Sequence, residues 1–534
     1  MKKLNKIFVA AISGLLLVGC NDLDTEPMGN IVTSDQKNDV YADAPEMLEA
    51  SVTGIPATTN QFGAVLGTGY HSDFGYPALM LHMDTRGYDF VSEDIGYNWF
   101  SSEVTYTDHI ANGVYTYNVW ANMYNQIKTS NTVVKAVDPN TTDETLKYYL
   151  AQALAFRAFN YHVLAQLYQF NYVGNETKPC VPLILAENED AVAAAGGAPR
   201  STVEEVYTQI LSDINDAVAL LEGTSASIAA GREGKKFVSL ATARGLRARV
   251  HLTMQNWDAA AADAQWVIQN SGATPYSIAQ VSKPCMSDAS DNSWLWGVIV
   301  EEGDRVVTIG ICNWPSHMGS LNYGYASVGA WRCISKKLYN TISATDARKG
   351  WWLGADGKSA NLNNSQQSYM TNTAKAKPYT QVKFAPYGDE IYTSTNANDI
   401  PLMRIEEMYL ILAEAQTMGS AGPATGAATL SSFVSTYRDP SYAYAGGSKE
   451  AVQTEVYRQR RIELWGEGLS WFDIMRLGVG VDRRGAGFEP AVCFNIAPND
   501  PIMILLIPID EVEANPNLGD NNPESTDPTP VADI

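Results

Sequence analysis

The chain reads LATARGLRARVHLTM over residues 240–254 and WDAAAADAQWVIQ over residues 257–269, with only Gln255 and Asn256 between them. Apolar and small residues recur at helical spacing in both stretches, and the alanine run 259–262 allows two helices to approach closely. The break is too short for anything except a turn. These residues therefore predict a helical hairpin.

Further helical patterns flank this hairpin on both sides. Residues 145–170 carry apolar residues on two faces, so that helix should be buried on both. We also expect helices over 202–221, starting at Ser201-Thr202 with two glutamates behind them, and over 403–418, 424–436 and 449–477. Paired helices with alanines and tyrosines at their contacts are similar to tetratricopeptide repeats.

Two long segments differ from these helices. Residues 63–106 and 271–399 are rich in Gly, Asn, Ser and aromatic residues and have no sustained helical period. They predict long loops and short strands, apart from a helix near 334–342 and a strand-like run over 294–300. Their aromatic content argues against disorder. The expected fold class is therefore mainly α, with a tetratricopeptide-like helical-repeat scaffold packed against an irregular, loop-rich lobe with short strands.

The first twenty residues look like a bacterial secretion signal. Lys2, Lys3 and Lys6 precede the uncharged apolar segment 7–19, which is too short to cross a bilayer as a helix. The segment ends in Leu17-Val18-Gly19-Cys20, which resembles a lipobox, so we expect Cys20 to be lipidated and to anchor the chain. An acidic tether would follow over 20–40. A plain signal peptide with an incidental cysteine is the alternative.

Charge and cysteine content restrict the partners. The formal net charge is −22 among 534 residues, and loss of the three signal lysines makes the mature chain more negative still. A field of this sign repels nucleic acid, so neutral ligands or cations remain. The five cysteines beyond Cys20 lack CxxC spacing, and we expect buried free thiols.

Three motifs near the C-terminus belong together. Residues 401–415 read PLMRIEEMYLILAEA, residues 458–468 read RQRRIELWGEG with DIMR at 473–476, and residues 506–517 read LIPIDEVEANPN. In this order they resemble the signatures of the SusD/RagB family, and the resemblance extends over nearly the whole mature chain. The chain departs from these family signatures at 470–472, where the family often has arginine, and at Asp510, where the family commonly has a second proline.

The resemblance implies a function and a location. It implies an outer-membrane, surface-exposed lipoprotein that captures a glycan or oligosaccharide and delivers it to a SusC-type, TonB-dependent barrel transporter. We expect the following organisation: signal peptide 1–19, lipidated tether 20–40, N-terminal helical-repeat region 41–270 with a ligand loop at 63–106, aromatic loop-rich lobe 271–400, and C-terminal signature region 401–534.

The sequence holds no recognisable catalytic motif. The six histidines form no HExxH or paired-ligand pattern, so we expect neither metal nor cofactor. Glu463 and Glu467 lie four residues apart and could be mistaken for the carboxylate pair of a glycosidase. We expect instead that these residues form structural ion pairs, because they and the other charged signature residues lie among apolar neighbours. Those other residues are Arg404, Glu414, Arg460 and Arg461.

The ligand site is sought among aromatic residues, because sugars present apolar C–H faces and hydroxyl rims that suit Trp and Tyr with nearby polar groups. Six of the twelve tryptophans lie between 294 and 352, and residues 70–106 are also rich in aromatics. We expect Trp294, Trp296, Trp351 and Trp352 to be core residues. The candidate ligand-binding residues are Asp73, Tyr76, Asp89, Tyr97, Asn98, Trp99, Trp314, His317, Tyr323, Tyr325 and Trp331.

Other functions remain open at this point. The family resemblance also implies peptide as a possible cargo in place of glycan. A lipoprotein glycosidase would need two convergent carboxylates in a cleft. A repeat-based scaffold for protein or peptide would present a concave polar face on its helices.

Overall fold

The structure is a computed structural model, and it describes residues 47–534. The chain divides into two units, Met1–Glu49 and Ala50–Ile534. The predicted signal peptide 1–19, the lipidated Cys20 and the tether 20–40 lie outside the described residues. Within 47–534, no helix is both long and apolar enough to cross a membrane.

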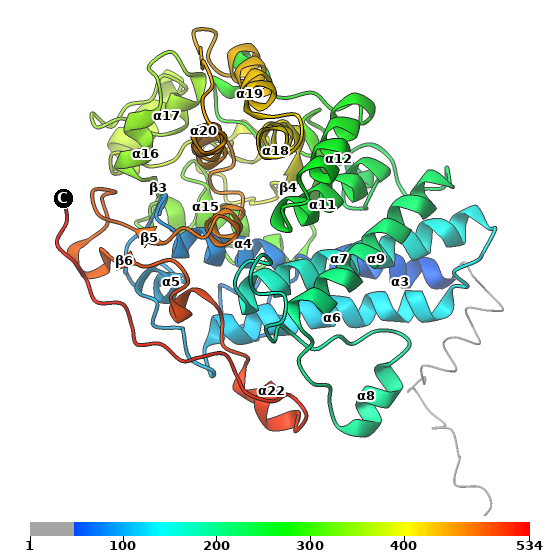
Figure 1. Ribbon diagram of the computed structural model, residues 1–534. Helices are drawn as coiled ribbons and strands as arrows, with labels where there is room; N and C mark the ends of the chain where they lie inside the picture. The colour runs from blue at the N-terminus through cyan, green and yellow to red at the C-terminus, as the bar shows by residue number, and fades with distance from the viewer. Residues whose placement is uncertain (1–46) are drawn as a thin grey trace, which may run out of the picture. The chain divides into compact units, whose positions relative to one another are not determined.

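Long helices packed side by side form the scaffold (Figure 1). Neighbours along this row are α6 (Val114–Ala136), α7 (Glu144–Tyr168), α9 (Val203–Glu222), α11 (Leu240–Thr253), α12 (Trp257–Asn270) and α18 (Ile405–Met418). α18 then packs against both α19 (Pro423–Tyr437) and α20 (Lys449–Glu463). The predicted tetratricopeptide-like, mainly helical fold class is confirmed.

Local signals explain where these helices begin. The side chain of Asp143 accepts hydrogen bonds from the backbone N–H of Thr145 and Leu146 at 2.8 and 2.9 Å, which caps α7. Thr202 and Glu205 form a reciprocal capping box at the start of α9, where the sequence predicts that a helix begins. The predicted hairpin is α11 and α12, separated by Met254, Gln255 and Asn256.

Short elements complete the unit. The remaining helices are α3 (Leu48–Ala57), α4 (Tyr76–Arg86), α5 (Ser101–Thr105), α8 (Glu189–Ala195), α10 (Gly231–Gly234), α13 (Ile278–Val281), α14 (Arg305–Thr308), α15 (Trp314–Met318), α16 (Lys336–Thr341), α17 (Asn364–Ser368), α21 (Ser470–Arg476) and α22 (Ile509–Ala514). The predicted helix near 334–342 is α16.

The strands form three two-stranded antiparallel sheets. They are β1 (Phe90–Val91) with β3 (Cys333–Ile334), β2 (Trp294–Val298) with β4 (Ile400–Arg404), and β5 (Val481–Asp482) with β6 (Asn495–Ile496). β2 lies within the run that the sequence predicts as a strand. β1 pairs with β3 across the predicted boundary at 270, and β2 pairs with β4 across the predicted boundary at 400. The predicted division into regions therefore stays a prediction from the sequence.

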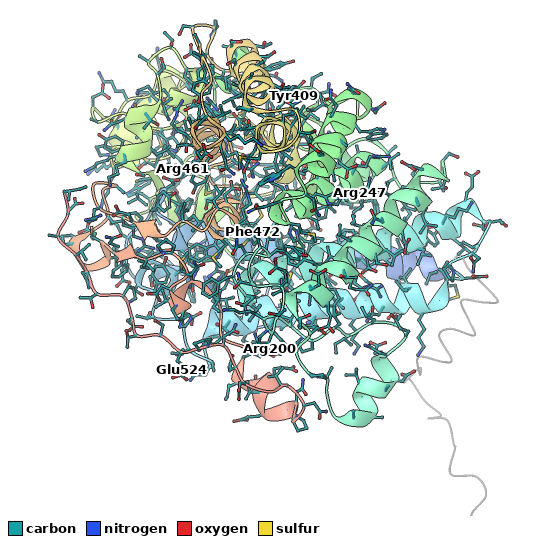
Figure 2. All side chains as sticks on the ribbon, in the orientation of Figure 1. Arg200, Arg247, Tyr409, Arg461, Phe472 and Glu524 are labelled. Carbon is teal, nitrogen blue, oxygen red and sulfur yellow. The ribbon has the colours of Figure 1, made fainter. Side chains whose placement is uncertain are left out.

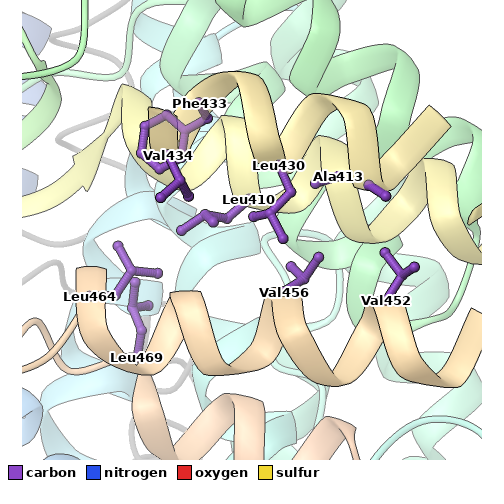
Figure 3. Close-up of a cluster of buried hydrophobic side chains, with 10 residues drawn as sticks. Leu410, Ala413, Leu430, Phe433, Val434, Val452, Val456, Leu464 and Leu469 are labelled. Atoms are coloured by element: carbon purple, nitrogen blue, oxygen red, sulfur yellow. The ribbon is translucent and has the colours of Figure 1, made fainter. Parts of the chain in front are cut away.

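Apolar side chains from α18, α19 and α20 form a buried cluster that holds the C-terminal helices together (Figure 3). Leu410 of α18, Leu430 of α19 and Val456 of α20 are each fully buried in it. Phe472 of α21, labelled in Figure 2, packs against this cluster from its edge. Burial of this kind is the main stabilising contribution to such a scaffold.

Helix α4 corrects the prediction that residues 63–106 contain only loops and short strands. All eleven of its residues are buried, from Tyr76 to Arg86. A helix covered on every side has no polar face, so its sequence shows no amphipathic period. The sequence patterns described above also fail to indicate α6.

The prediction of one continuous helix over 449–477 is wrong, because the helix is interrupted near its middle. It is broken into α20 and α21 by Gly466 and Gly468, whose φ angles are +76° and +73°. A side chain has no room at either position, because a Cβ would lie 2.2 Å from Met318 Cε and 2.6 Å from Met80 Cβ. The glycines allow the chain to turn where it passes these two methionines.

The charged signature residues form a buried network, as predicted. Glu463 accepts hydrogen bonds from Arg348, Arg404 and Arg438. Glu467 accepts hydrogen bonds from Arg404 at 2.7 Å and from Lys383 Nζ at 2.6 Å.

Ion pairs of the other signature residues continue this pattern. Arg460 pairs with Asp473 at 2.8 Å, and Arg476 pairs with Glu414 at 2.7 Å. Arg461, labelled in Figure 2, pairs with Asp89, which is 372 residues earlier in the chain. These contacts join α18, α20, α21 and the segment after α4.

The described cysteines form no disulfide bonds. As the sequence predicts, all five are free thiols and four of them are buried, while Cys333 is half-buried.

Arg200, labelled in Figure 2, donates hydrogen bonds to the Asp520 carbonyl at 2.9 Å and to Asn522 Oδ1 at 2.6 Å. The segment after α22 is therefore attached to the residues that precede α9.

Candidate functional site

Aromatic side chains from four segments come together near the surface. We call them the aromatic surface: His71, Tyr97, Trp99, Tyr323, Tyr325, Trp331 and Tyr392. Tyr97, Tyr323 and Tyr392 are 60%, 38% and 46% exposed. Five of the seven are residues that the sequence proposes as ligand contacts.

A ring stack forms one end of this surface. The Trp99 ring lies on His71, with centroids 4.6 Å apart and planes inclined by 22°. His71 Nδ1 is hydrogen-bonded to the Tyr325 hydroxyl. Burial lowers the pKa of His71, so its ring is neutral at pH 7. Trp99 is therefore held flat on a neutral support, with its own ring half-buried.

A shallow pocket of about 260 Å³ forms the other end. Trp331, Tyr369 and Tyr392 line it together with Gly329, and no carboxylate is among its lining residues. A Cβ on Gly329 would lie 3.9 Å from Tyr97, so Tyr97 stands at the pocket's edge. Burial raises the pKa of Tyr369 to about 12, which keeps its hydroxyl protonated.

A buried arginine supports the surface from below. Arg332 is fully buried and donates hydrogen bonds to the His317 carbonyl at 2.8 Å and to Asn98 Oδ1 at 3.0 Å. Burial lowers its pKa to about 9. His317 stacks beneath Tyr325 with centroids 4.7 Å apart. Arg332 therefore ties together the two loops that carry most of the aromatic surface.

Eight of the eleven proposed ligand residues are buried. Tyr325 and Trp331, each 7% exposed, contact other rings or the pocket of the aromatic surface, whereas the other six have structural partners. Asp73 Oδ2 accepts hydrogen bonds from the N–H of Val65 and Leu66, and both carboxylate oxygens of Asp89 are bound by Arg461. The others are Tyr76, Asn98, Trp314 and His317, which are 5%, 3%, 2% and 0% exposed. Their direct contact with a ligand stays a prediction, and we leave them out of the aromatic surface.

Two members of the aromatic surface, His71 and Tyr392, were not indicated by the sequence. The density of tyrosine and tryptophan locates the loops, whereas His71 is a lone histidine and Tyr392 follows a polar segment. Only their contacts with Trp99 and Tyr323 reveal their position.

The chemistry of this surface suits binding of neutral, ring-shaped ligands. Flat aromatic faces pack against apolar C–H groups, while hydroxyl groups at the edges offer hydrogen bonds. Within residues 47–534, no cluster of three or more His, Cys, Asp or Glu side chains could hold a metal ion. The predicted core tryptophans Trp294, Trp296, Trp351 and Trp352 are indeed buried.

Larger cavities than the shallow pocket also occur in the unit. One of about 610 Å³ is lined by the end of α3, the loop 59–64 and the residues that follow β2. Another of about 570 Å³ is lined by residues 283–288 and 385–389 among others. The sequence does not indicate either of them.

Comparisons with known proteins agree with this architecture. A family described as "Starch-binding associating with outer membrane" matches residues 81–249, and a family described as "SusD family" matches residues 325–523. "SusD-like protein P2" of Formosa agariphila is 27% identical over an alignment that covers 98% of this chain and 100% of that protein.

Solved structures share the fold. A SusD-like carbohydrate binding protein from Bacteroides vulgatus superposes with a TM-score of 0.72 at 21% identity, covering 91% of this chain and 98% of that one. Surface glycan-binding protein A from Bacteroides thetaiotaomicron, solved in complex with laminarihexaose, gives a TM-score of 0.60 at 16% identity, covering 89% and 99%. At these identities the likeness concerns the fold alone.

Proposed function

The chain belongs to the SusD/RagB family, and on that premise we propose that it captures a glycan or oligosaccharide at the cell surface. In this proposal Cys20 carries lipid that holds the protein on the outer membrane. The captured glycan passes to a SusC-type, TonB-dependent barrel transporter. The protein binds its ligand without cleaving it.

The observation that carries this proposal is the aromatic surface. Trp99 lies flat on His71, and Tyr97 and Tyr323 of the same surface are 60% and 38% exposed. The neighbouring pocket contains no carboxylate, whereas hydrolysis of a glycosidic bond by the usual mechanism requires two. The carboxylates of Glu463 and Glu467 are buried in ion pairs and inaccessible to a polysaccharide. These features favour capture over catalysis.

A binding screen tests the proposal. We would titrate oligosaccharides and peptides into the protein without its predicted lipidated cysteine, and follow heat release together with chromatography of the products. We expect saturable binding of a glycan with no shorter products. Trp99→Ala should weaken binding about tenfold, because it removes a flat ring that a sugar can cover.

A matched variant makes the result specific. Trp266→Ala on α12 removes a tryptophan far along the scaffold, where it packs on Arg244. This variant should bind as the wild type does. Release of shorter sugars would contradict capture without cleavage. Binding of peptides but of no glycan would favour a peptide cargo for the same import system.

A further inference from the structure

The cavity of about 610 Å³ lies next to the aromatic surface. Phe62 connects the two: it lines the cavity, and its ring meets His71 of the aromatic surface edge-on with centroids 6.5 Å apart. His71 in turn supports Trp99. A continuous series of three rings therefore leads from the partly exposed Trp99 through His71 and Phe62 to the cavity.

One loop, closed by its own hydrogen bonds, carries both Phe62 and His71. The Gly63 N–H donates to the Asp73 carbonyl at 2.8 Å, and the Tyr76 N–H donates to the Thr59 carbonyl at 2.8 Å. The Asp73 carboxylate closes the loop from inside through its bonds to the N–H of Val65 and Leu66. Gly75 has a φ of +82°, and a Cβ there would lie 2.3 Å from the Thr59 carbonyl oxygen. The relative position of Phe62 and His71 is thus set before a ligand arrives.

The cavity has the composition of a binding site. Its apolar lining includes Phe62, Phe156 and Trp296, and its polar lining includes Asn60 and Gln61. Its volume falls within the roughly 300 to 1,000 Å³ typical of small-molecule sites.

Most charges around the cavity are already engaged. Glu233 pairs with Lys236 at 2.8 Å, and Glu301 pairs with Arg232 at 2.5 Å. Asp304 Oδ2 accepts a hydrogen bond from the Glu301 N–H at 2.9 Å. These groups shape the rim but have little capacity left for a charged ligand.

Arg305 differs from these groups. It is exposed at the start of α14, and among the described residues no carboxylate lies within 4.0 Å of its guanidinium. Its guanidinium lies 6.0 Å from the centre of the Phe62 ring. A guanidinium over an aromatic ring has a defined plane and keeps its N–H donors available.

We propose that this cavity is a second subsite, which binds further sugar units of the oligosaccharide held on Trp99. Arg305, held over the buried Phe62 ring, donates hydrogen bonds to hydroxyl or carboxylate oxygens of those units. This inference rests on the proposed function. It adds that the protein selects oligosaccharides long enough to reach from the aromatic surface into the cavity.

Pairs of long and short sugars test the proposal. We would titrate laminarihexaose and laminaribiose, maltohexaose and maltose, and cellohexaose and cellobiose by calorimetry. In the pair that binds, the hexasaccharide should bind at least about tenfold more tightly than the disaccharide. Arg305→Ala should weaken the binding of the hexasaccharide about tenfold and leave the binding of the disaccharide unchanged, because it deletes charge-assisted hydrogen bonds to the additional sugar units.

A second variant tests the cavity independently of charge. Ala64 is an exposed lining residue, and Ala64→Trp should fill the space and weaken the hexasaccharide by a similar factor. The matched controls are Ala193→Trp on α8 and Arg484→Ala, where the wild-type arginine pairs with Asp482. Both should leave the affinities for the hexasaccharide and the disaccharide unchanged. Unaltered thermal unfolding would establish that every variant is folded.

The outcomes separate the two proposals. If Trp99→Ala weakens the hexasaccharide but Arg305→Ala and Ala64→Trp do not, the second subsite is wrong and the capture function stands. If hexasaccharide and disaccharide bind equally, the same conclusion follows. If none of the three pairs binds and wider glycan panels are silent too, the capture function fails and this inference with it.

Discussion

Removal of the Glu463 carboxylate should destabilise the scaffold strongly. Glu463 is fully buried and accepts hydrogen bonds from three arginines that come from different parts of the chain: Arg348 at 3.1 Å, Arg404 at 3.2 Å and Arg438 at 2.7 Å. These arginines are themselves fully buried. Glu463→Ala would leave three buried guanidinium groups with one fewer counter-charge.

The magnitude follows from this geometry. Loss of one partner of a buried ion pair costs about 3 to 5 kcal/mol, since a charge is left without compensation. Arg404 keeps Glu467, and Arg348 keeps Asp346, so the effect should not exceed the upper end of this range. For a unit the size of Ala50–Ile534, with an unfolding entropy of about 1 kcal/mol/K, this corresponds to a fall in Tm of roughly 3 to 5 °C.

The pH dependence supplies a second measure. Burial alone would raise the pKa of Glu463, but Arg438, Arg404 and Arg348 hold it well below its usual value of 4.5. A carboxylate with a lowered pKa contributes stability above its unfolded pKa and loses that contribution as the pH falls through its folded pKa. The difference in stability between wild type and Glu463→Ala should therefore be constant at neutral pH and shrink well below pH 4.5.

Calorimetric unfolding at pH 7 and at several acidic pH values would measure both effects. Glu450→Ala, at the exposed start of the same helix, is the matched control and should leave the Tm unchanged. Equal Tm values for Glu463→Ala and Glu450→Ala would refute the reasoning, because they would mean that the buried arginines do not need this carboxylate.

Three other outcomes are expected. His71→Ala should weaken glycan binding about as much as Trp99→Ala does in the same titrations, since His71 supports that ring; an undiminished affinity would argue against the stack as ligand platform. Burial and the nearby Glu103 charge raise the pKa of Asp108 from 3.8 to about 7, so part of the unfolding free energy should be lost as the pH rises from about 4 to 7. Asp108→Asn should lack this decline in urea titrations, and an identical slope would count against the assignment. Gly468→Ala should lower stability by about 1 to 3 kcal/mol more than Gly478→Ala, because both need a positive φ but only Gly468 has a close neighbour; equal losses would remove that contact from the explanation.

Local sequence patterns were sufficient for the helices that face the core on one or two sides. The apolar periods of α7, α9, α11 and α12 lie within the helices themselves, and the caps at Asp143 and Thr202 are adjacent in sequence. These features need no knowledge of the partner helix. The same reasoning fails for α4, whose burial on all sides depends on segments far away in the chain.

The sequence also indicated which charges would be structural but not their partners. Charged residues among apolar neighbours must be compensated, so the signature arginines and glutamates were expected to form ion pairs. The pairing of Arg461 with Asp89, 372 residues apart, follows only from the folded chain. The same holds for Arg348 and Arg438, which no motif marks as partners of Glu463.

For the candidate site, amino-acid composition located the loops, and the tertiary structure decided which of their side chains face solvent. The frequency of Tyr and Trp indicated residues 70–106 and 314–331, because few other residue types present flat apolar faces with a polar edge. Whether a given ring faces solvent depends on what packs against it. Trp314 and His317 are covered by Phe384 and Phe74, whereas Trp99 stacks on His71 and stays partly exposed. Burial is a property of contacts between distant segments, so the folded chain alone separates the ligand platform from its support.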